Sequence, residues 1–184
     1  LRCIYRCRIS GADNIPDDGA VIIASNHMSM NDVIIISAAA KRQVFYMAKK
    51  ELFGFAPLGS FLRMLGAFPV DRKNGTAGIK AAVKELSLGK AVGIFPQGTR
   101  HKHIHPRETK IRNGVGMLVC RARCPVVPVS ITTANFRIIP IFRRITVRFG
   151  EPMYPDAFDD IMQNDDRFSI ISERVFEKIL SGIG

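Results

Sequence analysis

The amino-acid sequence predicts an α/β fold: a single domain in which helices flank a mixed, largely parallel sheet. Short β-branched runs alternate with longer segments of helical periodicity, which is the pattern of parallel strands joined by crossover helices. The 184 residues suit one domain with a core that buries about 70% of the unfolded surface. No repeat or long linker divides the chain, so we expect one domain over residues 1–184.

Short apolar segments supply the predicted strands. The run AVIIAS at 20–25 is β-branched and almost free of polar residues, as expected of a strand buried on both faces. The other segments are bounded by turn residues or charges. The predicted strands cover residues 20–25, 44–48, 67–72, 91–96, 125–131 and 145–150.

Helical periodicity fills the intervals between these strands. In one segment Ile79, Val83 and Leu86 recur at helical spacing with lysines elsewhere, and Gly89 follows as a helix stop. The predicted helices cover residues 33–41, 76–88, 114–123 and 166–180, and residues 99–110 predict a polar loop.

Residues 49–65, KKELFGFAPLGSFLRML, allow two interpretations. One is a core helix broken at Pro57. The other is an interfacial membrane segment that inserts Phe53, Phe55 and Phe61. The sequence leaves both open. Its apolar runs are far shorter than the ~20 residues that cross a bilayer.

Charge is unevenly distributed along the chain. The net charge is +11; residues 151–184 hold eight acidic and three basic side chains, so residues 1–150 carry +16. A basic body with an acidic C-terminal helical segment indicates an anionic partner, such as nucleic acid, an anionic membrane or a phosphorylated molecule. We expect no nucleic acid, because no recognised module appears, Trp is absent and Tyr is scarce.

The sequence predicts no metal site. Its four cysteines form two C-x3-C pairs 113 residues apart, unlike the spacing of most zinc sites, and they predict free thiols. Three alternating histidines, His101, His103 and His105, lie in the polar loop, where solvation is favoured over ligation.

His27 and Asp32 are five residues apart, which on one helix would turn them about 140° away from each other. They meet only if His27 precedes the helix and Asp32 lies in its first turn. Ser29 as N-cap, with Asp32 at the third helical position, would produce that arrangement. The carboxylate would then hold one imidazole nitrogen and leave the other as a base. The alternative is a capping pair beside an ordinary loop histidine.

Further candidate site residues follow the ends of the predicted strands. Asn26 and His27 follow the strand at 20–25, at the edge where open α/β sheets place their sites. Parallel strands ending in FPVDR and IFPQGTR would bring Arg72 and Arg100 to the same edge. No serine or cysteine nucleophile accompanies the histidine, so a substrate hydroxyl is the expected nucleophile. The arginines favour a substrate that carries phosphate.

Four blocks resemble those of the glycerolipid acyltransferases. NHMSMND at 26–32 is similar to N-H-x-S-x-x-D, and GAFPVDR at 66–72 to G-x-x-F-[IV]-D-R. FPQGTR at 95–100 is similar to F-P-E-G-T-R, and VPVSI at 127–131 to a Pro-containing strand. Order and spacing match across residues 11–150. The likeness is greatest to the 1-acylglycerol-3-phosphate acyltransferases, which make phosphatidic acid.

The resemblance implies roles residue by residue. His27 would take the proton of the acceptor hydroxyl, Asp32 would orient His27, and the oxygen would attack the thioester of acyl-CoA or acyl carrier protein. Arg72 would hold the acceptor phosphate beside Arg100, with Lys49 and Lys50 as further contacts. The implied substrate-binding residues are Asn26, Ser29, Asp71, Arg72, Gln97, Gly98, Thr99 and Arg100. Gln97 departs from the family's Glu, keeping its size and losing its charge.

The implied acceptor is lysophosphatidic acid, and the implied location is a peripheral or monotopic position on the cytoplasmic face of an anionic membrane. No cofactor is expected beyond the acyl donor. Two alternatives stay open: acylation of glycerol 3-phosphate or another lysophospholipid, and a non-catalytic module that binds anionic lipid.

Overall fold

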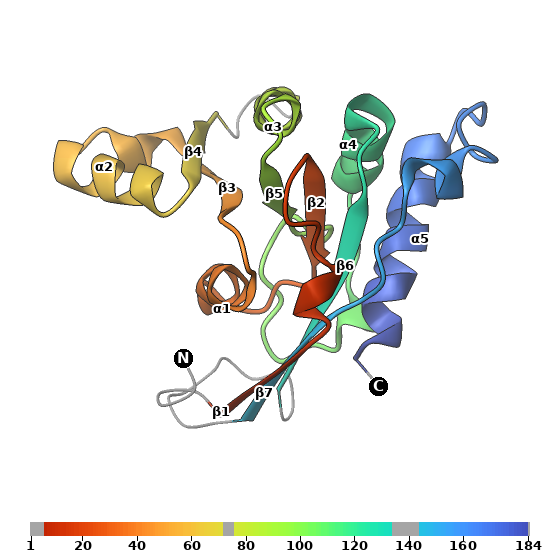
Figure 1. Ribbon diagram of the computed structural model, residues 1–184, viewed down its shortest axis with the longest axis horizontal. Coiled ribbons are helices and arrows are strands. Elements are labelled where there is room, and N and C mark those ends of the chain that lie inside the picture. Colours follow the sequence, from red (N-terminus) through yellow and green to blue (C-terminus); the bar gives the residue numbers. More distant parts are fainter. Residues whose placement is uncertain (1–5, 72–75, 134–143, 184) are drawn as a thin grey trace.

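A computed structural model describes residues 6–71, 76–133 and 144–183. One seven-stranded sheet runs through the molecule in the order β1-β7-β6-β2-β5-β3-β4 (Figure 1). Every neighbouring pair is parallel except β6 and β7, which are antiparallel. The strands are β1 Arg6–Ser10, β2 Val21–Ser25, β3 Val44–Lys49, β4 Ala67–Val70, β5 Ala91–Ile94, β6 Val126–Thr133 and β7 Arg144–Phe149. The predicted mixed, largely parallel sheet is confirmed.

Helices follow most of the strands. The α-helices are α1 Asn31–Ala39, α2 Ala56–Met64, α3 Ala77–Ser87, α4 Gly114–Ala122 and α5 Arg167–Ser181. The short 3-10 helices are η1 Ala12–Asn14, η2 Lys50–Phe53, η3 Pro106–Glu108 and η5 Pro155–Phe158. Four of the five α-helices lie within two residues of the predicted ranges.

Sequence reasoning missed the edge strand β1. Its sequence, RCRIS, alternates arginine with Cys7 and Ile9 and lacks the β-branched run that identified the central strands. It pairs only with β7, in parallel register from Arg6 opposite Arg144 to Ser10 opposite Arg148. Pairing with a partner about 140 residues away, rather than its own composition, makes this segment a strand.

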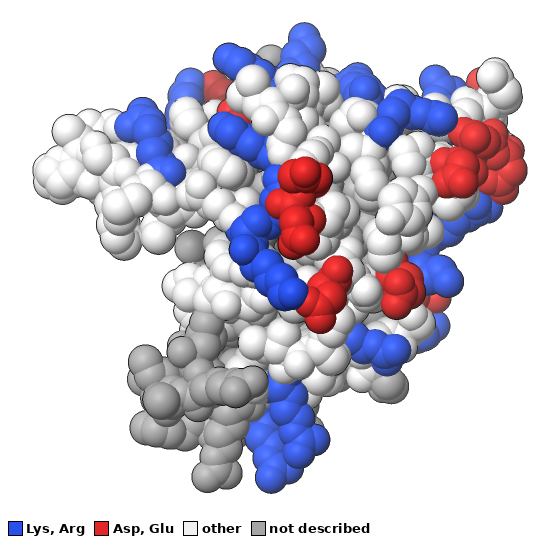
Figure 2. All heavy atoms as spheres, viewed as in Figure 1, with Lys and Arg blue, Asp and Glu red and all other residues white. Residues whose placement is uncertain are grey.

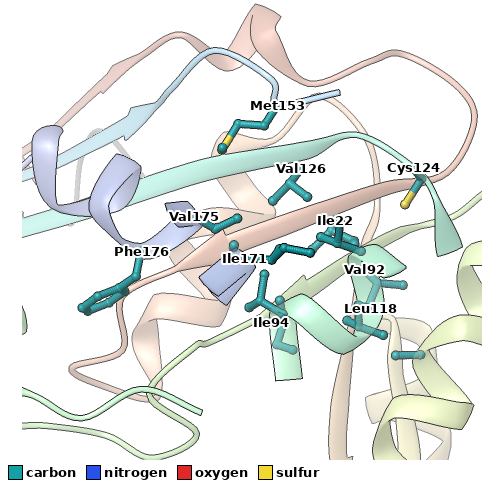
Figure 3. Close-up of a cluster of buried hydrophobic side chains, with 14 of the residues drawn as sticks. Ile22, Val92, Ile94, Leu118, Cys124, Val126, Met153, Ile171, Val175 and Phe176 are labelled. Carbon is teal, nitrogen blue, oxygen red and sulfur yellow. The ribbon is translucent and has the colours of Figure 1, made fainter. Parts of the chain in front are cut away.

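Alternate residues of the central strands enter two separate cores. Ile22 and Val92 face α3, α4 and α5, together with residues such as Leu118 and Val175 (Figure 3). On the other face, Ile23 packs with Ile35 and other residues of α1. Strand β2 is buried along its whole length, and this packing sets the position of the residues that follow its carboxyl end.

The core-helix interpretation of residues 49–65 is wrong. Pro57 does not break a helix there; it lies in the first turn of α2, where a missing N–H costs nothing. Exposed large apolar side chains run through η2, α2 and the residues around them: Leu52, Phe55, Leu58, Phe61, Met64 and Leu65. The helix projects from the body at one end of the sheet (Figure 1).

Candidate active site

The site lies at the carboxyl edge of the parallel strands. Strand β2 ends at Ser25 and is followed by His27, and strand β5 ends at Ile94 and is followed by Gln97. Seventy residues separate these two side chains in the sequence, yet the His27 backbone N–H donates to Gln97 Oε1 at 2.6 Å. The expectation that strand ends converge is confirmed for these two segments.

His27 and Asp32 form a hydrogen-bonded pair. Nδ1 of His27 lies 2.9 Å from Oδ2 of Asp32, and the Asp32 side chain is fully buried. Oδ2 also accepts the backbone N–H groups of Met28 at 2.6 Å and Ser29 at 2.7 Å. Three donors on one oxygen stabilise the buried carboxylate. Oδ1 of Asp32 has no hydrogen-bond partner in the part of the chain that the structure describes.

The start of α1 differs from the predicted capping box. The helix begins at Asn31 with Met30 as its N-cap, so Asp32 is the second helical residue and not the third. Ser29 lies one residue before the cap, where its Oγ accepts the N–H of Asn31 at 3.2 Å. The Asp32 carboxylate therefore faces back along the chain, toward the loop that holds His27.

This geometry sets the protons on the imidazole. A deprotonated carboxylate only accepts, so the Nδ1 that faces Asp32 carries the proton and Nε2 keeps its lone pair. The His27 side chain is 13% exposed. A largely buried base with a fixed tautomer can take a proton from a hydroxyl placed against Nε2.

Aromatic stacking limits the orientation of the His27 imidazole. Phe95 stacks on His27 with ring centroids 3.8 Å apart and planes at 15°. Tyr46 of β3 lies parallel to Phe95 at 6.0 Å, and burial raises the pKa of its hydroxyl well above the usual range. Gly93 makes room for this stack, because a Cβ there would lie 2.0 Å from the Tyr46 ring. The functional blocks identified the segment that contains Phe95, but its stacking had no sequence signal.

The loop between β5 and α4 closes over the strand ends. Gly98 adopts a φ of +68°, and a Cβ there would lie 2.7 Å from Arg112, so glycine is required at this turn. Thr99 and Arg100 are exposed. The N–H of His101 donates to the backbone O of His27 at 3.0 Å. The backbone of His27 is thus held on both sides by one loop.

Asn26 is committed to the fold. It is fully buried; its Nδ2 donates to the Ile131 backbone O at 2.9 Å, and its Oδ1 accepts the Ile131 N–H at 2.8 Å. These bonds fasten the end of β2 to β6. They give Asn26 a structural role and occupy both polar atoms of its amide.

The second family block is only partly described. Asp71 follows β4 and accepts from Lys50 Nζ at 2.5 Å, which joins the end of β4 to the start of η2. Lys49 and Lys50 are exposed. Arg72, the expected phosphate ligand, lies outside the described residues.

No group of three or more metal-ligating side chains occurs within residues 6–71, 76–133 and 144–183. Cys7, Cys120 and Cys124 are free thiols. Burial raises the pKa of Cys124 to about 11, so this thiol stays protonated at neutral pH. His105 uses its Nδ1 to accept the N–H of Arg107 at 3.1 Å.

A strand-end histidine held by a buried carboxylate can act as a base on a substrate hydroxyl, and the comparisons with known proteins show the family to which the chain belongs. The family model Acyltransferase matches residues 6–132, and the chain belongs to this family.

Several curated relatives carry the name of one enzyme. The chain is 32% identical to a 1-acyl-sn-glycerol-3-phosphate acyltransferase of Bacillus subtilis over 94% of this chain and 85% of that protein. It is 29% identical to the enzyme of that name from Streptococcus pneumoniae, over 89% of this chain and 61% of that protein. The crystal structure of the 1-acyl-sn-glycerophosphate (LPA) acyltransferase from Thermotoga maritima superposes with a TM-score of 0.71 at 24% identity. That alignment covers 96% of this chain and 70% of the crystal structure's chain, and it supports the fold.

Proposed function

We propose that this chain transfers a fatty acyl group from a thioester to the free hydroxyl of 1-acylglycerol 3-phosphate, giving phosphatidic acid. The observation that carries the proposal is the His27–Asp32 pair, with His27 Nδ1 2.9 Å from Asp32 Oδ2. The names of the Bacillus subtilis and Streptococcus pneumoniae relatives support this acceptor.

In the proposed reaction His27 Nε2 removes the proton of the acceptor hydroxyl as its oxygen attacks the thioester carbonyl. The negative charge of Asp32 stabilises the imidazolium that forms. The carbon–sulfur bond then breaks, and the imidazolium returns the proton to the departing thiolate. The products are an ester and a free thiol, and the thioester of acyl-CoA or acyl carrier protein is a substrate, so no cofactor takes part.

Basic groups around the edge suit a phosphate-bearing acceptor. Arg100 is exposed next to the Gly98 turn, and Lys49 is exposed where β3 ends. We assign the acceptor phosphate to Arg100 and Arg72, with the Gly98–Thr99 backbone beside them. The Gly98 N–H itself donates to the Phe95 backbone O at 2.9 Å and closes the turn.

The membrane surface is the proposed place of reaction. No helix within the described residues is long and apolar enough to cross a bilayer. The α2 arm, defined as residues 50–65, begins at the carboxyl edge and presents a largely uncharged projection with basic side chains beside it (Figure 2). Phe55 and Met64 are each 67% exposed. Apolar residues flanked by lysine and arginine are the pattern of an interfacial anchor on anionic lipid at the cytoplasmic face.

The test is turnover by purified protein in detergent. Lysophosphatidic acid with acyl-CoA or acyl carrier protein should yield free thiol and phosphatidic acid in equal amounts. Glycerol 3-phosphate and uncharged lysophospholipids, assayed in parallel, identify the acceptor. Faster turnover of one of them would assign the alternative acceptor, and no turnover with any pair would leave only the lipid-binding module.

A further inference from the structure

Gln97 uses both ends of its buried side chain. The residue is 3% exposed. Its Oε1 accepts the backbone N–H of His27 at 2.6 Å, and its Nε2 donates to Thr109 Oγ1 at 2.7 Å. Thr109 Oγ1 in turn lies 2.6 Å from the backbone O of Pro106. One side chain therefore connects the histidine loop to the far end of the β5–α4 loop.

The donor and the acceptor of each of these three hydrogen bonds are determined. A backbone N–H can only donate, so the Gln97 atom that faces His27 must be the oxygen, and the atom that faces Thr109 must be the NH2 group. The single hydroxyl proton of Thr109 then goes to Pro106. Both polar atoms of the buried Gln97 amide therefore have a hydrogen-bond partner, as burial requires.

A glutamate at position 97, the residue of the family pattern, would alter these hydrogen bonds. Its second oxygen could only accept, so the Thr109 hydroxyl would have to turn from Pro106 to the carboxylate. A second negative charge would also be buried near Asp32. The amide at 97 and the hydroxyl at 109 therefore match each other, which accounts for a departure that the sequence left unexplained.

We infer that Gln97 is a positioning residue, which sets the place of His27 through its backbone and couples that place to the β5–α4 loop through Thr109. The inference rests on the proposed function for its kinetic consequence. Its structural content, protection of the His27 amide, does not depend on that function.

Three variants separate the two ends of the side chain. Gln97→Met keeps the shape and loses both bonds, so kcat should fall about tenfold or more, because small displacements of a catalytic group cost up to about 10²-fold. Gln97→Glu keeps the acceptor for His27 and should lose less. Thr109→Val removes the bonds of the hydroxyl to Gln97 and Pro106 and leaves the bond between Gln97 and His27, so KM for the acceptor should rise while kcat falls less than in Gln97→Met.

Ser172→Ala is the matched control for a lost buried hydrogen bond. Ser172 Oγ accepts the Gly116 N–H at 2.9 Å between α5 and α4. Its loss should lower Tm about as much as Gln97→Met without the fall in kcat. Amide exchange followed by NMR should show faster exchange of the His27 N–H in Gln97→Met and near wild-type exchange in Gln97→Glu.

The inference is overturned if Gln97→Met keeps kcat within about twofold of wild type, or if the His27 amide exchanges at the wild-type rate in that variant. If Ser172→Ala lowers kcat equally, the effect is one of stability and Gln97 does not position His27. Should wild-type protein fail to acylate any acceptor, the proposed function fails and the exchange measurement still decides whether Gln97 holds His27.

Discussion

The junction between β2 and α1 and the α2 arm both begin at the carboxyl edge of the sheet, yet they meet opposite physical demands. At the junction, Asp32 is fully buried and receives three hydrogen bonds on one oxygen. On the arm, Phe55 and Phe61 are 67% and 51% exposed. One region buries a charge, which costs free energy unless the charge is hydrogen-bonded. The other exposes apolar side chains to water, which is typical of an interaction surface.

We therefore assign the reaction to the β2–α1 junction and membrane binding to the α2 arm. A buried, fully oriented carboxylate gives His27 one tautomer, and it tolerates little change because its partners are backbone groups fixed by β2 and α1. The arm carries no such constraint, since α2 packs mainly on η2 and β4. Changes at the junction should therefore alter rate, and changes on the arm should alter membrane binding with rate in detergent preserved.

The largest effect is expected from His27→Ala. Removing the base should lower kcat at least about 10²-fold, the usual contribution of a general base. The assay is thiol release in detergent, with circular dichroism to verify the fold. His103→Asn, a change at an exposed loop histidine, is the control and should stay near wild type. Turnover of folded His27→Ala at the wild-type rate would rule out the proposed mechanism.

Asp32→Asn should have the next largest effect. An amide can still accept the N–H groups of Met28 and Ser29, so the fold should survive, but the imidazolium loses its charge partner. We expect kcat to fall about tenfold or more, and less than in His27→Ala. A larger loss than His27→Ala, measured in the same assay, would mean that Asp32 does more than orient and stabilise the histidine.

Gly93→Ala probes the ring stack behind His27. The added Cβ would lie 2.0 Å from the Tyr46 ring, which must move. We expect the free energy of unfolding to fall by about 2 kcal/mol, the usual cost of overpacking, together with a lower kcat because Phe95 loses its support. Denaturant unfolding measures it. Gly54→Ala, whose Cβ would meet only ordinary contact at 3.5 Å, should be near neutral.

The smallest expected effect is on the arm, and it should leave catalysis in detergent unchanged. Phe55→Ser with Phe61→Ser should weaken binding to vesicles of anionic lipid about tenfold, because each ring loses part of its apolar transfer energy. Sedimentation with vesicles at rising salt is the measurement, and wild-type binding should weaken with salt. Salt-insensitive binding would contradict an electrostatic contribution, and wild-type vesicle binding by the folded double variant would contradict insertion of these rings.

Much of this molecule could be predicted from the sequence because the signals are local. The run at β2 is apolar enough to be a buried parallel strand, and the spacing of His27 and Asp32 allows contact only across a loop-to-helix junction. Both statements follow from geometry within about ten residues. The helices α3 and α5 followed from their periodicity for the same reason.

What only the tertiary structure decided involves partners far apart in the chain. β1 is a strand because of β7, and Asn26 is structural because Ile131 of β6 lies against it. Gln97 reaches the His27 N–H across seventy residues, and α2 is exposed although its sequence equally suited a core helix. Composition and periodicity report which side chains can be buried. Which long-range partner meets each of them depends on how the whole sheet packs.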